Sequence, residues 1–211
     1  MLKTIVFDFD GTLADSKEAF LSAYNQIAER HGYPAMTWAL FDELKKLSIK
    51  ERCSMLGIPL HKIPFLIGEL SKQYKQSLKY IQMMEGAVDM LRELSELGYA
   101  LAIISSNEEK NIRTFLQIHE LNYFSTILCS KKLFAKDRLM RKYVKHNNFD
   151  VSEVLYVGDE ERDIVASKKC GIKVIWAKWG FDSIENVRNA KPDYIAERPE
   201  DVVHIAQALA H

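Results

Sequence analysis

The order of predicted elements indicates an α/β protein with a doubly wound parallel sheet and a smaller α-helical domain. Residues 2–9 are mostly apolar and β-branched, which is typical of a strand buried on both faces. From residue 85 onward, amphipathic helices alternate with short apolar strands, and this alternation predicts a parallel sheet with right-handed crossovers. Residues 16–84 show helical patterns, with no convincing strand between residues 38 and 80. We therefore expect a core domain of residues 1–15 and 85–211 and a helical cap domain of residues 16–84.

The predicted helices of the insertion follow the first strand directly. Asp15 or Ser16 is expected to cap the first helix, with Glu18 completing a capping box, and this helix should end near Gly32. Apolar residues at helical spacing predict further helices over residues 40–47, 49–56 and 64–80. Four cationic side chains of this segment could contact an anionic substrate, namely Lys45, Lys46, Lys50 and Arg52.

The second half of the chain alternates regularly. Helices are expected over residues 87–97, 110–118, 137–146, 163–170 and 201–209. Strands are expected over residues 99–104, 126–129, 154–157 and 174–177, with a shorter one over residues 194–196. Ligands of doubly wound sheets bind beyond the carboxyl ends of the strands. The polar residues that follow each strand are therefore the candidate functional residues.

Composition and charge exclude several classes of function. The 211 residues include 29 Lys and Arg and 29 Asp and Glu, so no net positive field is expected to recruit nucleic acid or an anionic membrane. No apolar run approaches the roughly 20 residues that span a bilayer, and no cationic leader precedes the first strand. Cys53, Cys129 and Cys170 are odd in number and widely spaced, as expected of thiols in a reducing cytoplasm. We expect a cytoplasmic protein that binds neither nucleic acid nor membrane.

The first predicted strand ends in two carboxylates, Asp8 and Asp10, followed by Gly11 and Thr12. Because side chains alternate along a strand, both carboxylates can point in one direction where the strand ends. Two like charges so close repel unless a cation lies between them or one of them is protonated. A cation would make the pair a phosphate site, and a proton would make one member a general acid. The alternative is a surface turn, in which Asp, Gly and Thr are common.

Polar residues also follow the next two core strands. The hydroxyl of Ser105 and the amides of the helix that follows could bind a phosphate oxygen, although Ser105 could equally be a helix N-cap. Lys131, Lys132 and Lys136 follow the third strand. One of these lysines could neutralise a phosphoryl group, although lysines in loops are usually only solvated.

The fourth strand end carries Asp159 and Asp163, four residues apart. On a helix this spacing puts both carboxylates on one face, and oxygen-rich ligands suit magnesium. The alternative is an acid-rich helix start, which the helix macrodipole favours.

Taken together and in order, these residues resemble the four signatures of the haloacid dehalogenase-like (HAD) superfamily. The signatures are Asp-x-Asp, a Ser or Thr, a Lys, and an acidic Gly-Asp-x-x-x-Asp segment. The corresponding positions are Asp8 with Asp10, Ser105, Lys136, and Gly158-Asp159 with Asp163. The resemblance covers the whole chain and implies a HAD-type Rossmannoid core, with the insertion in the place of a C1-type cap.

Within the superfamily the chain looks most like the phosphoglycolate phosphatase group. The segments that carry this likeness are Ser105-Ser106-Asn107, Gly158-Asp159-Glu160 with Arg162-Asp163, and Trp179-Gly180-Phe181. The resemblance implies a magnesium-dependent phosphatase that hydrolyses small phosphomonoesters, phosphoglycolate-like metabolites among them, through an aspartyl-phosphate. Such an enzyme would be a monomer or a homodimer.

The resemblance also implies roles for individual residues. Asp8 would be the nucleophile, and Asp10 would protonate the leaving group and then deprotonate the attacking water. Magnesium would be held by Asp8, the backbone carbonyl of Asp10, and Asp159.

The remaining signature residues would bind phosphate or support the site. Ser105, Ser106 and Lys136 would bind the phosphate oxygens. Asp163 would support either the metal shell or Lys136, and Gly11 and Thr12 would have supporting places beside the two aspartates.

Asp10 discriminates among the reactions of the superfamily. Dehalogenases resemble this scaffold but lack an acid at this position, so Asp10 favours phosphate monoesters. Phosphomutases keep both acids and remain an alternative. A non-catalytic regulatory protein that binds a phospholigand is an alternative from another class.

Overall fold

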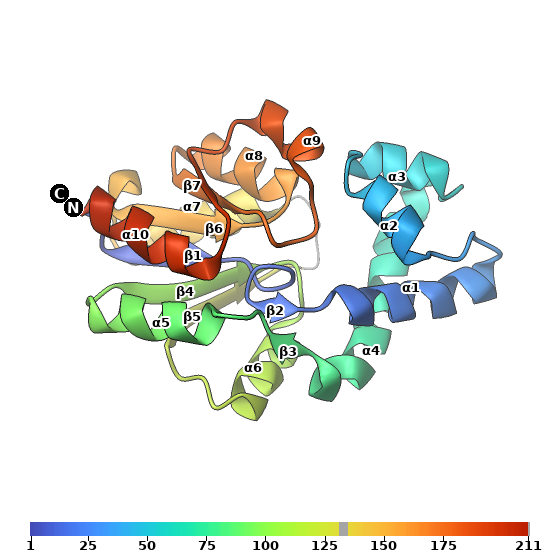
Figure 1. Ribbon diagram of the computed structural model, residues 1–211, viewed down its shortest axis with the longest axis horizontal. Helices are drawn as coiled ribbons and strands as arrows, with labels where there is room; N and C mark the ends of the chain where they lie inside the picture. The colour runs from blue at the N-terminus through green and yellow to red at the C-terminus, as the bar shows by residue number, and fades with distance from the viewer. Residues whose placement is uncertain (131–134, 211) are drawn as a thin grey trace.

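The computed structural model describes residues 1–130 and 135–210 and consists of a sheet lobe and a group of helices beyond one end of the sheet (Figure 1). Six parallel strands in the order β5-β4-β1-β6-β7-β8 form the sheet, with helices on both faces. The predicted α/β class with a parallel, doubly wound sheet is therefore confirmed. Lys131 and Lys132, two of the candidate phosphate-binding lysines, lie outside the described residues.

The first strand is central, as its apolar sequence predicts. The strands of the sheet are β1 (Thr4–Phe7), β4 (Ala100–Ser105), β5 (Phe124–Cys129), β6 (Val154–Gly158), β7 (Lys173–Ala177) and β8 (Tyr194–Ala196). Thr4 pairs with Ala100 of β4 on one side and with Val154 of β6 on the other. The chain thus builds outward to β5 and then returns across β1 to β6. This change of direction makes the carboxyl ends of β1, β4 and β6 the expected place for a ligand.

Side chains alternate between the two faces of the sheet along each strand, and apolar side chains form a packed layer on each face. On one face lie α5 (Ala87–Glu96), α6 (Glu109–Ile118) and α10 (Pro199–Leu209), and on the other lie α7 (Lys136–His146) and α8 (Glu161–Cys170). In β1, Ile5 and Phe7 pack into the first layer, and Val6 packs into the second. Each such buried side chain stabilises the fold by about 1.5–3 kcal/mol. A short helix, α9 (Ile184–Val187), follows β7.

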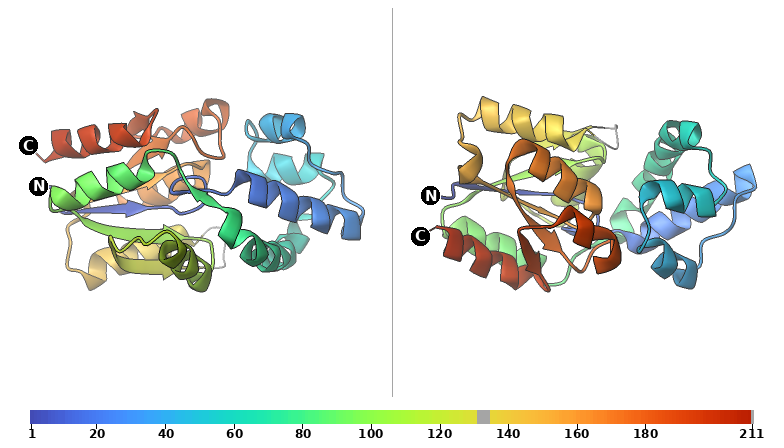
Figure 2. Two further views of the ribbon diagram at one scale, coloured as in Figure 1. Left: turned by 60° about the horizontal axis from the view of Figure 1, so that its bottom comes forward. Right: turned by 90° about the horizontal axis from the view of Figure 1, so that it is seen from above.

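The remaining helices form a lobe of their own, which we call the helical lobe. Its members are α1 (Lys17–His31), α2 (Trp38–Leu44), α3 (Ile49–Met55) and α4 (Ile63–Ser77), with a 3₁₀ turn at Leu78–Tyr80 after α4. A separate apolar cluster that includes Tyr24, Phe41 and Leu56 holds the lobe together. Figure 2 shows that the lobe lies beyond the carboxyl ends of the strands, whereas both chain termini lie at the opposite end.

Two very short antiparallel strands, β2 (Ala14–Asp15) and β3 (Gln82–Met83), join the lobes. The backbone amide of Met84 also donates to the carbonyl of Leu13 at 2.8 Å. The sequence did not predict this ribbon, because strands of two residues show no alternation. The pairing of β2 with β3 places the two chain segments that connect the lobes side by side.

The expected capping box at the start of α1 is wrong. Asp15 pairs with Gln82 in the β2–β3 ribbon, and Ser16 becomes the N-cap residue with φ −99° and ψ 8°. This conformation lies outside the extended region that lets an N-cap side chain reach the first amides, and no side-chain cap forms. The predicted end of the helix is confirmed, because Gly32 adopts the left-handed conformation with φ 70°.

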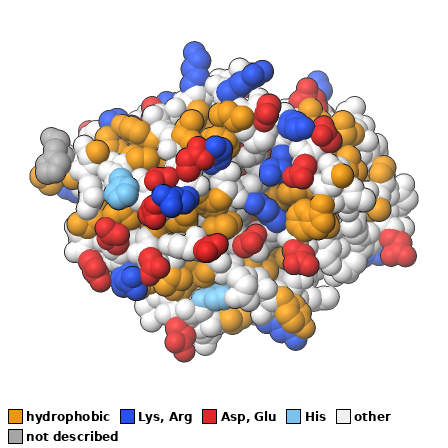
Figure 3. Space-filling model, in the orientation of Figure 1, with side chains coloured by type: hydrophobic (Ala, Val, Ile, Leu, Met, Phe, Trp, Pro, Cys, Tyr) orange, Lys and Arg blue, Asp and Glu red, His pale blue; other side chains and the backbone are white. Residues whose placement is uncertain are grey.

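Charges of both signs alternate over the face of the molecule shown in Figure 3. Equal numbers of basic and acidic residues in the sequence lead to this mixed surface. Within the described part of the chain, every helix is too short or too polar to traverse a lipid bilayer.

Candidate active site

Asp8 lies where β1 ends and is almost completely buried, with 2% of its surface exposed. Its backbone amide donates to the carbonyl of Val157 at 2.8 Å, which continues the pairing with β6 by one residue. The amide of Phe9 donates to Asp8 Oδ1 at 2.7 Å, and Lys136 Nζ lies 2.5 Å from Asp8 Oδ2. The carboxylate of Asp8 thus lies at the end of β1, where the buried ammonium group of Lys136 neutralises it.

Lys136, the first residue of α7, bridges two carboxylates. Besides Asp8, it donates to Oδ1 of Asp163, and all three side chains are buried. Burial acts to lower the pKa of Lys136, but attraction to Asp163 and Asp8 outweighs burial and raises this pKa. Burial raises the pKa of Asp163 to about 6, although Lys136 acts in the opposite direction. The ammonium group is therefore held in its charged form between the strand ends.

The prediction that Asp159 and Asp163 lie on one face of a helix is wrong, because α8 begins only at Glu161. Asp159 precedes the helix. Asp163 accepts from the amide of Glu160 at 3.2 Å as part of the capping box of α8. A Cβ atom at Gly158 would lie 2.7 Å from Asp163, so the backbone at the end of β6 leaves room only for glycine. Asp159 in the loop and Asp163 in the helix nevertheless lie near each other.

Asp159 is completely buried and accepts one hydrogen bond on each carboxylate oxygen. Thr12 Oγ1 donates to Oδ1 at 2.8 Å, and the amide of Phe181 donates to Oδ2 at 2.7 Å. Burial and the nearby carboxylates of Glu160 and Asp8 raise the pKa of Asp159 well above its ordinary value. Because both hydrogen-bond donors are neutral, the negative charge of this carboxylate is not balanced by them.

Gly11 allows the loop after β1 to approach Asp159. Its φ is 77°, and a Cβ atom at this position would lie 2.4 Å from both Asp159 Oδ2 and the ring of Phe181. Only a residue without a side chain fits here. The supporting places expected for Gly11 and Thr12 are thus next to Asp159.

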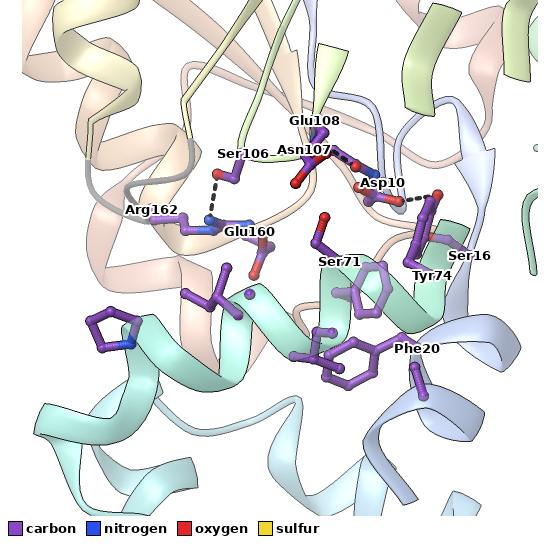
Figure 4. Close-up of a pocket in the computed structure, with 16 residues that line it drawn as sticks. Asp10, Ser16, Phe20, Ser71, Tyr74, Ser106, Asn107, Glu108, Glu160 and Arg162 are labelled. Atoms are coloured by element: carbon purple, nitrogen blue, oxygen red, sulfur yellow. Dashed lines mark hydrogen bonds and ion pairs between the residues drawn. The ribbon is translucent and has the colours of Figure 1, made fainter. Parts of the chain in front are cut away.

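Asp10 is held by two hydrogen bonds from different lobes (Figure 4). Tyr74 of α4 donates its hydroxyl to Oδ1 at 2.6 Å, and Asn107 Nδ2 donates to Oδ2 at 2.9 Å. Burial raises the pKa of Asp10, although these two hydrogen bonds act in the opposite direction. A carboxyl group with a raised pKa is suited to carrying a proton.

The two serines after β4 have different partners. Ser105 is buried, and its Oγ accepts from the amide of Asn107 at 3.1 Å. Ser106 Oγ accepts from Arg162 Nη1 at 2.8 Å, and Arg162 Nε donates to Glu160 Oε2 at 2.6 Å. The loops after β4 and β6 are thus joined through Arg162.

A cavity of about 250 Å³ lies between the helical lobe and the strand ends. Its wall on the helical lobe is mostly apolar and includes Phe20, Ala23, Pro64, Ile67 and Leu70. Its wall on the sheet lobe is polar and includes Asp10, Ser106, Asn107, Glu160 and Arg162. This volume lies just below the roughly 300–1,000 Å³ that is usual for small-molecule pockets.

The four cationic candidates of the helical lobe do not line this cavity among the described residues. Lys45, Lys46 and Arg52 each form an ion pair with an acidic residue of the chain. Lys50 lines a second cavity, of about 330 Å³, which also contains Lys136.

Tyr74 is a residue of the cavity that sequence reasoning missed entirely. It lies 64 positions from Asp10, in a helix whose pattern shows only an apolar face. Asn107 and Arg162 lie in the motifs quoted for the resemblance, but no role was assigned to them. Their proximity to the signature residues was the only signal available.

The donor atoms around Asp8 fit a hard divalent cation. Carboxylate oxygens of Asp8, Glu160 and Asp163 lie within 4.8 Å of one another in the described structure, and buried Asp159 lacks a cationic hydrogen-bond donor. Magnesium prefers oxygen ligands of this kind. Lys136 lies between Asp8 and Asp163 of this cluster, and among the described residues the cluster does not include Asp159.

Comparison with known proteins agrees with this geometry. The family model described as haloacid dehalogenase-like hydrolase matches residues 5–177. The chain therefore belongs to the haloacid dehalogenase-like hydrolase family and is a phosphatase-type hydrolase of that family. A predicted phosphatase from Clostridium acetobutylicum has the same fold, with a TM-score of 0.83, 19% sequence identity, and coverage of 100% of this chain and 99% of that one.

The names of two relatives indicate which reactions occur among similar chains. A phosphoglycolate phosphatase from Synechococcus elongatus is 29% identical over 209 residues, which cover 99% of each chain. A glyceraldehyde 3-phosphate phosphatase from Pyrococcus abyssi is 32% identical over 201 residues, which cover 85% of this chain and 83% of that one. Both names describe hydrolases of small phosphate esters.

Proposed function

We propose that this protein is a magnesium-dependent phosphatase that hydrolyses small phosphomonoesters through an aspartyl-phosphate on Asp8. The observation that carries the proposal is the buried contact of Asp8 with Lys136 at the strand ends, with Asp10 two residues further along the chain. A carboxylate beside a fixed cation can approach a phosphate dianion that it would otherwise repel.

The two aspartates after β1 have complementary environments. Asp8 contacts the ammonium group of Lys136, and this cation would also attract the phosphoryl group toward the nucleophilic carboxylate. Asp10 has a raised pKa and borders the cavity, so it can protonate the leaving oxygen and later take a proton from water. Lys136 would neutralise the phosphoryl oxygens, and Ser105 and Ser106 would bind them through hydroxyl and amide groups.

Asp8, the backbone carbonyl of Asp10, and Asp159 would hold the magnesium ion. The raised pKa of Asp159 supports this assignment, because burial and the neighbouring carboxylates disfavour its ionised form without a further cation. Magnesium supplies charge neutralisation and orientation of the phosphoryl group when it is bound. Asp163 supports the site by holding Lys136.

We further propose that residues 16–84 act as a cap domain over a core domain of residues 1–15 and 85–211. The two short crossings at β2 and β3 resemble a hinge, and the cavity lies between the lobes. Closure would exclude bulk water during transfer, and opening would release products. The substrate would be a small phosphorylated metabolite, such as those named for the two relatives.

We place this activity in the cytoplasm. Cys53, Cys129 and Cys170 are free thiols in the described structure, which suits a reducing compartment. The enzyme would act there as a monomer or a homodimer.

A panel of phosphomonoesters tests the proposal. Phosphate release should require magnesium, stop with a chelator, and disappear in Asp8→Asn, while circular dichroism of the variant stays unchanged. Isomerisation of a sugar phosphate with a bisphosphate primer, without phosphate release, would indicate a mutase instead. Binding of an ester without any turnover would indicate a regulatory protein. Either result would overturn the proposed hydrolysis.

A further inference from the structure

Tyr74 connects the helical lobe to the carboxyl group of Asp10. Its hydroxyl donates to Oδ1 at 2.6 Å, whereas Asn107 Nδ2 donates to Oδ2 at 2.9 Å (Figure 4). Tyr74 is 8% exposed, and its ring packs in the same apolar cluster as Leu78 and Ile81. The two oxygens of Asp10 therefore have different and well-held partners.

The amide of Asn107 has only one possible orientation. Its Oδ1 accepts from the amide of Glu108 at 2.7 Å and from Asn111 Nδ2 at 3.1 Å, so Nδ2 must face Asp10. An amide nitrogen donates and cannot accept. Oδ2 of Asp10 is thus kept as an acceptor, and a proton on this carboxyl group belongs on Oδ1.

Tyr74 can serve both forms of Asp10, because a phenolic hydroxyl is both a donor and an acceptor. It donates to Oδ1 when the carboxylate is ionised, and it can rotate its O–H away when Oδ1 carries the proton. Both side chains line the cavity between the lobes. The proton on Oδ1 is then next to the space that the leaving group of the substrate would occupy.

We propose that Tyr74 is a positioning residue that directs Oδ1 of Asp10 toward the leaving oxygen of the substrate. This inference rests on the proposed phosphatase function. In the first step an oxygen of Asp8 bonds to phosphorus while the ester P–O bond breaks. The electron pair of that bond goes to the leaving oxygen, which takes the proton from Asp10 Oδ1 and departs as an alcohol. In the second step a water molecule returns a proton to Asp10, and its oxygen displaces Asp8 from phosphorus.

The reactivity of the leaving group separates positioning from a merely structural role. An aliphatic alkoxide needs a proton as it departs, whereas 4-nitrophenolate departs readily without one. The value of kcat/KM reports events up to the first irreversible step, here the transfer to Asp8. Tyr74→Phe should lower kcat/KM by about 10-fold or more for the best aliphatic ester of the panel, and by less than about 3-fold for 4-nitrophenyl phosphate.

Two comparisons complete the experiment. Tyr24→Phe removes another buried hydroxyl of the helical lobe, which donates to the carbonyl of Pro34 at 3.0 Å, and it should change neither substrate's kcat/KM. In an Asp10→Asn background, Tyr74→Phe should have almost no further effect on the residual hydrolysis of the aliphatic ester, because the group it positions is already lost.

The possible results distinguish this inference from the proposed function. Equal losses for both substrates, or full additivity with Asp10→Asn, would overturn the role of Tyr74 while leaving the phosphatase intact. A wild-type protein that releases no phosphate from either ester would overturn the proposed function itself. Thermal unfolding of each variant verifies that the fold is retained.

Discussion

Arg52 of α3 forms an ion pair with the buried carboxylate of Asp182, which lies in the loop after β7. Asp182 is 3% exposed and also accepts from the amide of Glu161 at 2.7 Å, so its position relative to the sheet lobe is well defined. Next to it, the ring of Phe181 packs edge-on against the ring of Phe20 of the helical lobe, and the two ring centroids lie 5.7 Å apart. The segment after β7 thus joins the two lobes by charge and by aromatic packing.

Removal of Arg52 should weaken the fold measurably. Arg52→Met leaves the carboxylate of Asp182 buried without its cation, and we expect the free energy of unfolding to fall by about 1–3 kcal/mol. Urea denaturation measures this change. In a double-mutant cycle with Asp182→Asn, the two losses should not add, because both variants remove one shared ion pair. Additive losses would show that the pair contributes nothing.

Asp182 should also give the stability of the protein a characteristic pH dependence. Burial and the nearby Glu160 raise its pKa from 3.8 to about 6, although Arg52 acts in the opposite direction. The folded state therefore binds this proton more tightly than the unfolded state does. The resulting stability is complete below pH 3.8 and is lost as the pH rises through about 6.

The comparison of wild type with Asp182→Asn isolates this effect from those of other groups. Between pH 4 and pH 7 the difference in the free energy of unfolding should shift by about 2 kcal/mol in favour of the variant. Urea titrations at several pH values measure the shift. A difference that stays constant with pH would mean that Asp182 keeps its ordinary pKa in the folded protein.

Gly11→Ala should cost more than backbone strain alone. Gly11 and Gly32 both have a left-handed φ, 77° and 70°, but a Cβ atom at Gly11 would lie 2.4 Å from Asp159, whereas nothing lies within 4 Å at Gly32. Both alanine variants should lose about 1 kcal/mol from the left-handed conformation. Gly11→Ala should lose about 2 kcal/mol more through overlap with Asp159 and Phe181. Equal melting temperatures for the two variants would contradict the crowded geometry of this loop.

Lys136→Met should abolish most activity. The substitution leaves Asp8 and Asp163 buried without the ammonium group that bridges them, and it removes a cation from the phosphate site. We expect kcat/KM to fall by about 10²–10³-fold. Lys142→Met, which removes an exposed lysine from the same helix, is the matched control and should leave kcat/KM unchanged. Comparable activity in the two variants would exclude Lys136 from the site.

Magnesium should stabilise the protein even without substrate. Binding to the buried carboxylates would raise the free energy of unfolding by about 2.7 kcal/mol at 100 times the dissociation constant, or about 5–10 °C in melting temperature. Asp159→Asn should lose most of this shift. Glu161→Gln, which changes a neighbouring carboxylate outside the proposed ligand set, should keep it. The same shift in Asp159→Asn as in wild type would place the metal elsewhere.

The sequence was sufficient to predict the parallel sheet and the strand ends at which Asp8 and Asp159 lie. Apolar runs mark β1 and β6 because both strands are buried on each face, and the parallel topology then brings Asp8 and Asp159 to one edge. Boundaries were less predictable. The apolar run over residues 2–9 becomes Thr4–Phe7, because ladder pairing to β4 and β6 decides where β1 begins and ends.

Contacts between the lobes could not be predicted from the sequence. Tyr74 and Asp10 are 64 positions apart, and Arg52 and Asp182 are 130 positions apart. Helical periodicity indicates which face of α4 is apolar, but it does not say which side chain of that face meets the sheet lobe. Arg52 is a candidate to contact an anionic substrate on sequence grounds, yet its guanidinium group forms an ion pair with a carboxylate of the chain itself.

The central claim is that Asp8 becomes phosphorylated during turnover, and rapid acid quenching tests it most directly. Wild-type protein mixed with magnesium and excess 4-nitrophenyl phosphate should yield, after digestion and mass spectrometry, a peptide carrying one phosphoryl group on Asp8. Asp8→Asn should yield none under the same conditions. Phosphate release by the wild type with no modified Asp8 at any quench time, or release by Asp8→Asn at the wild-type rate, would contradict the account.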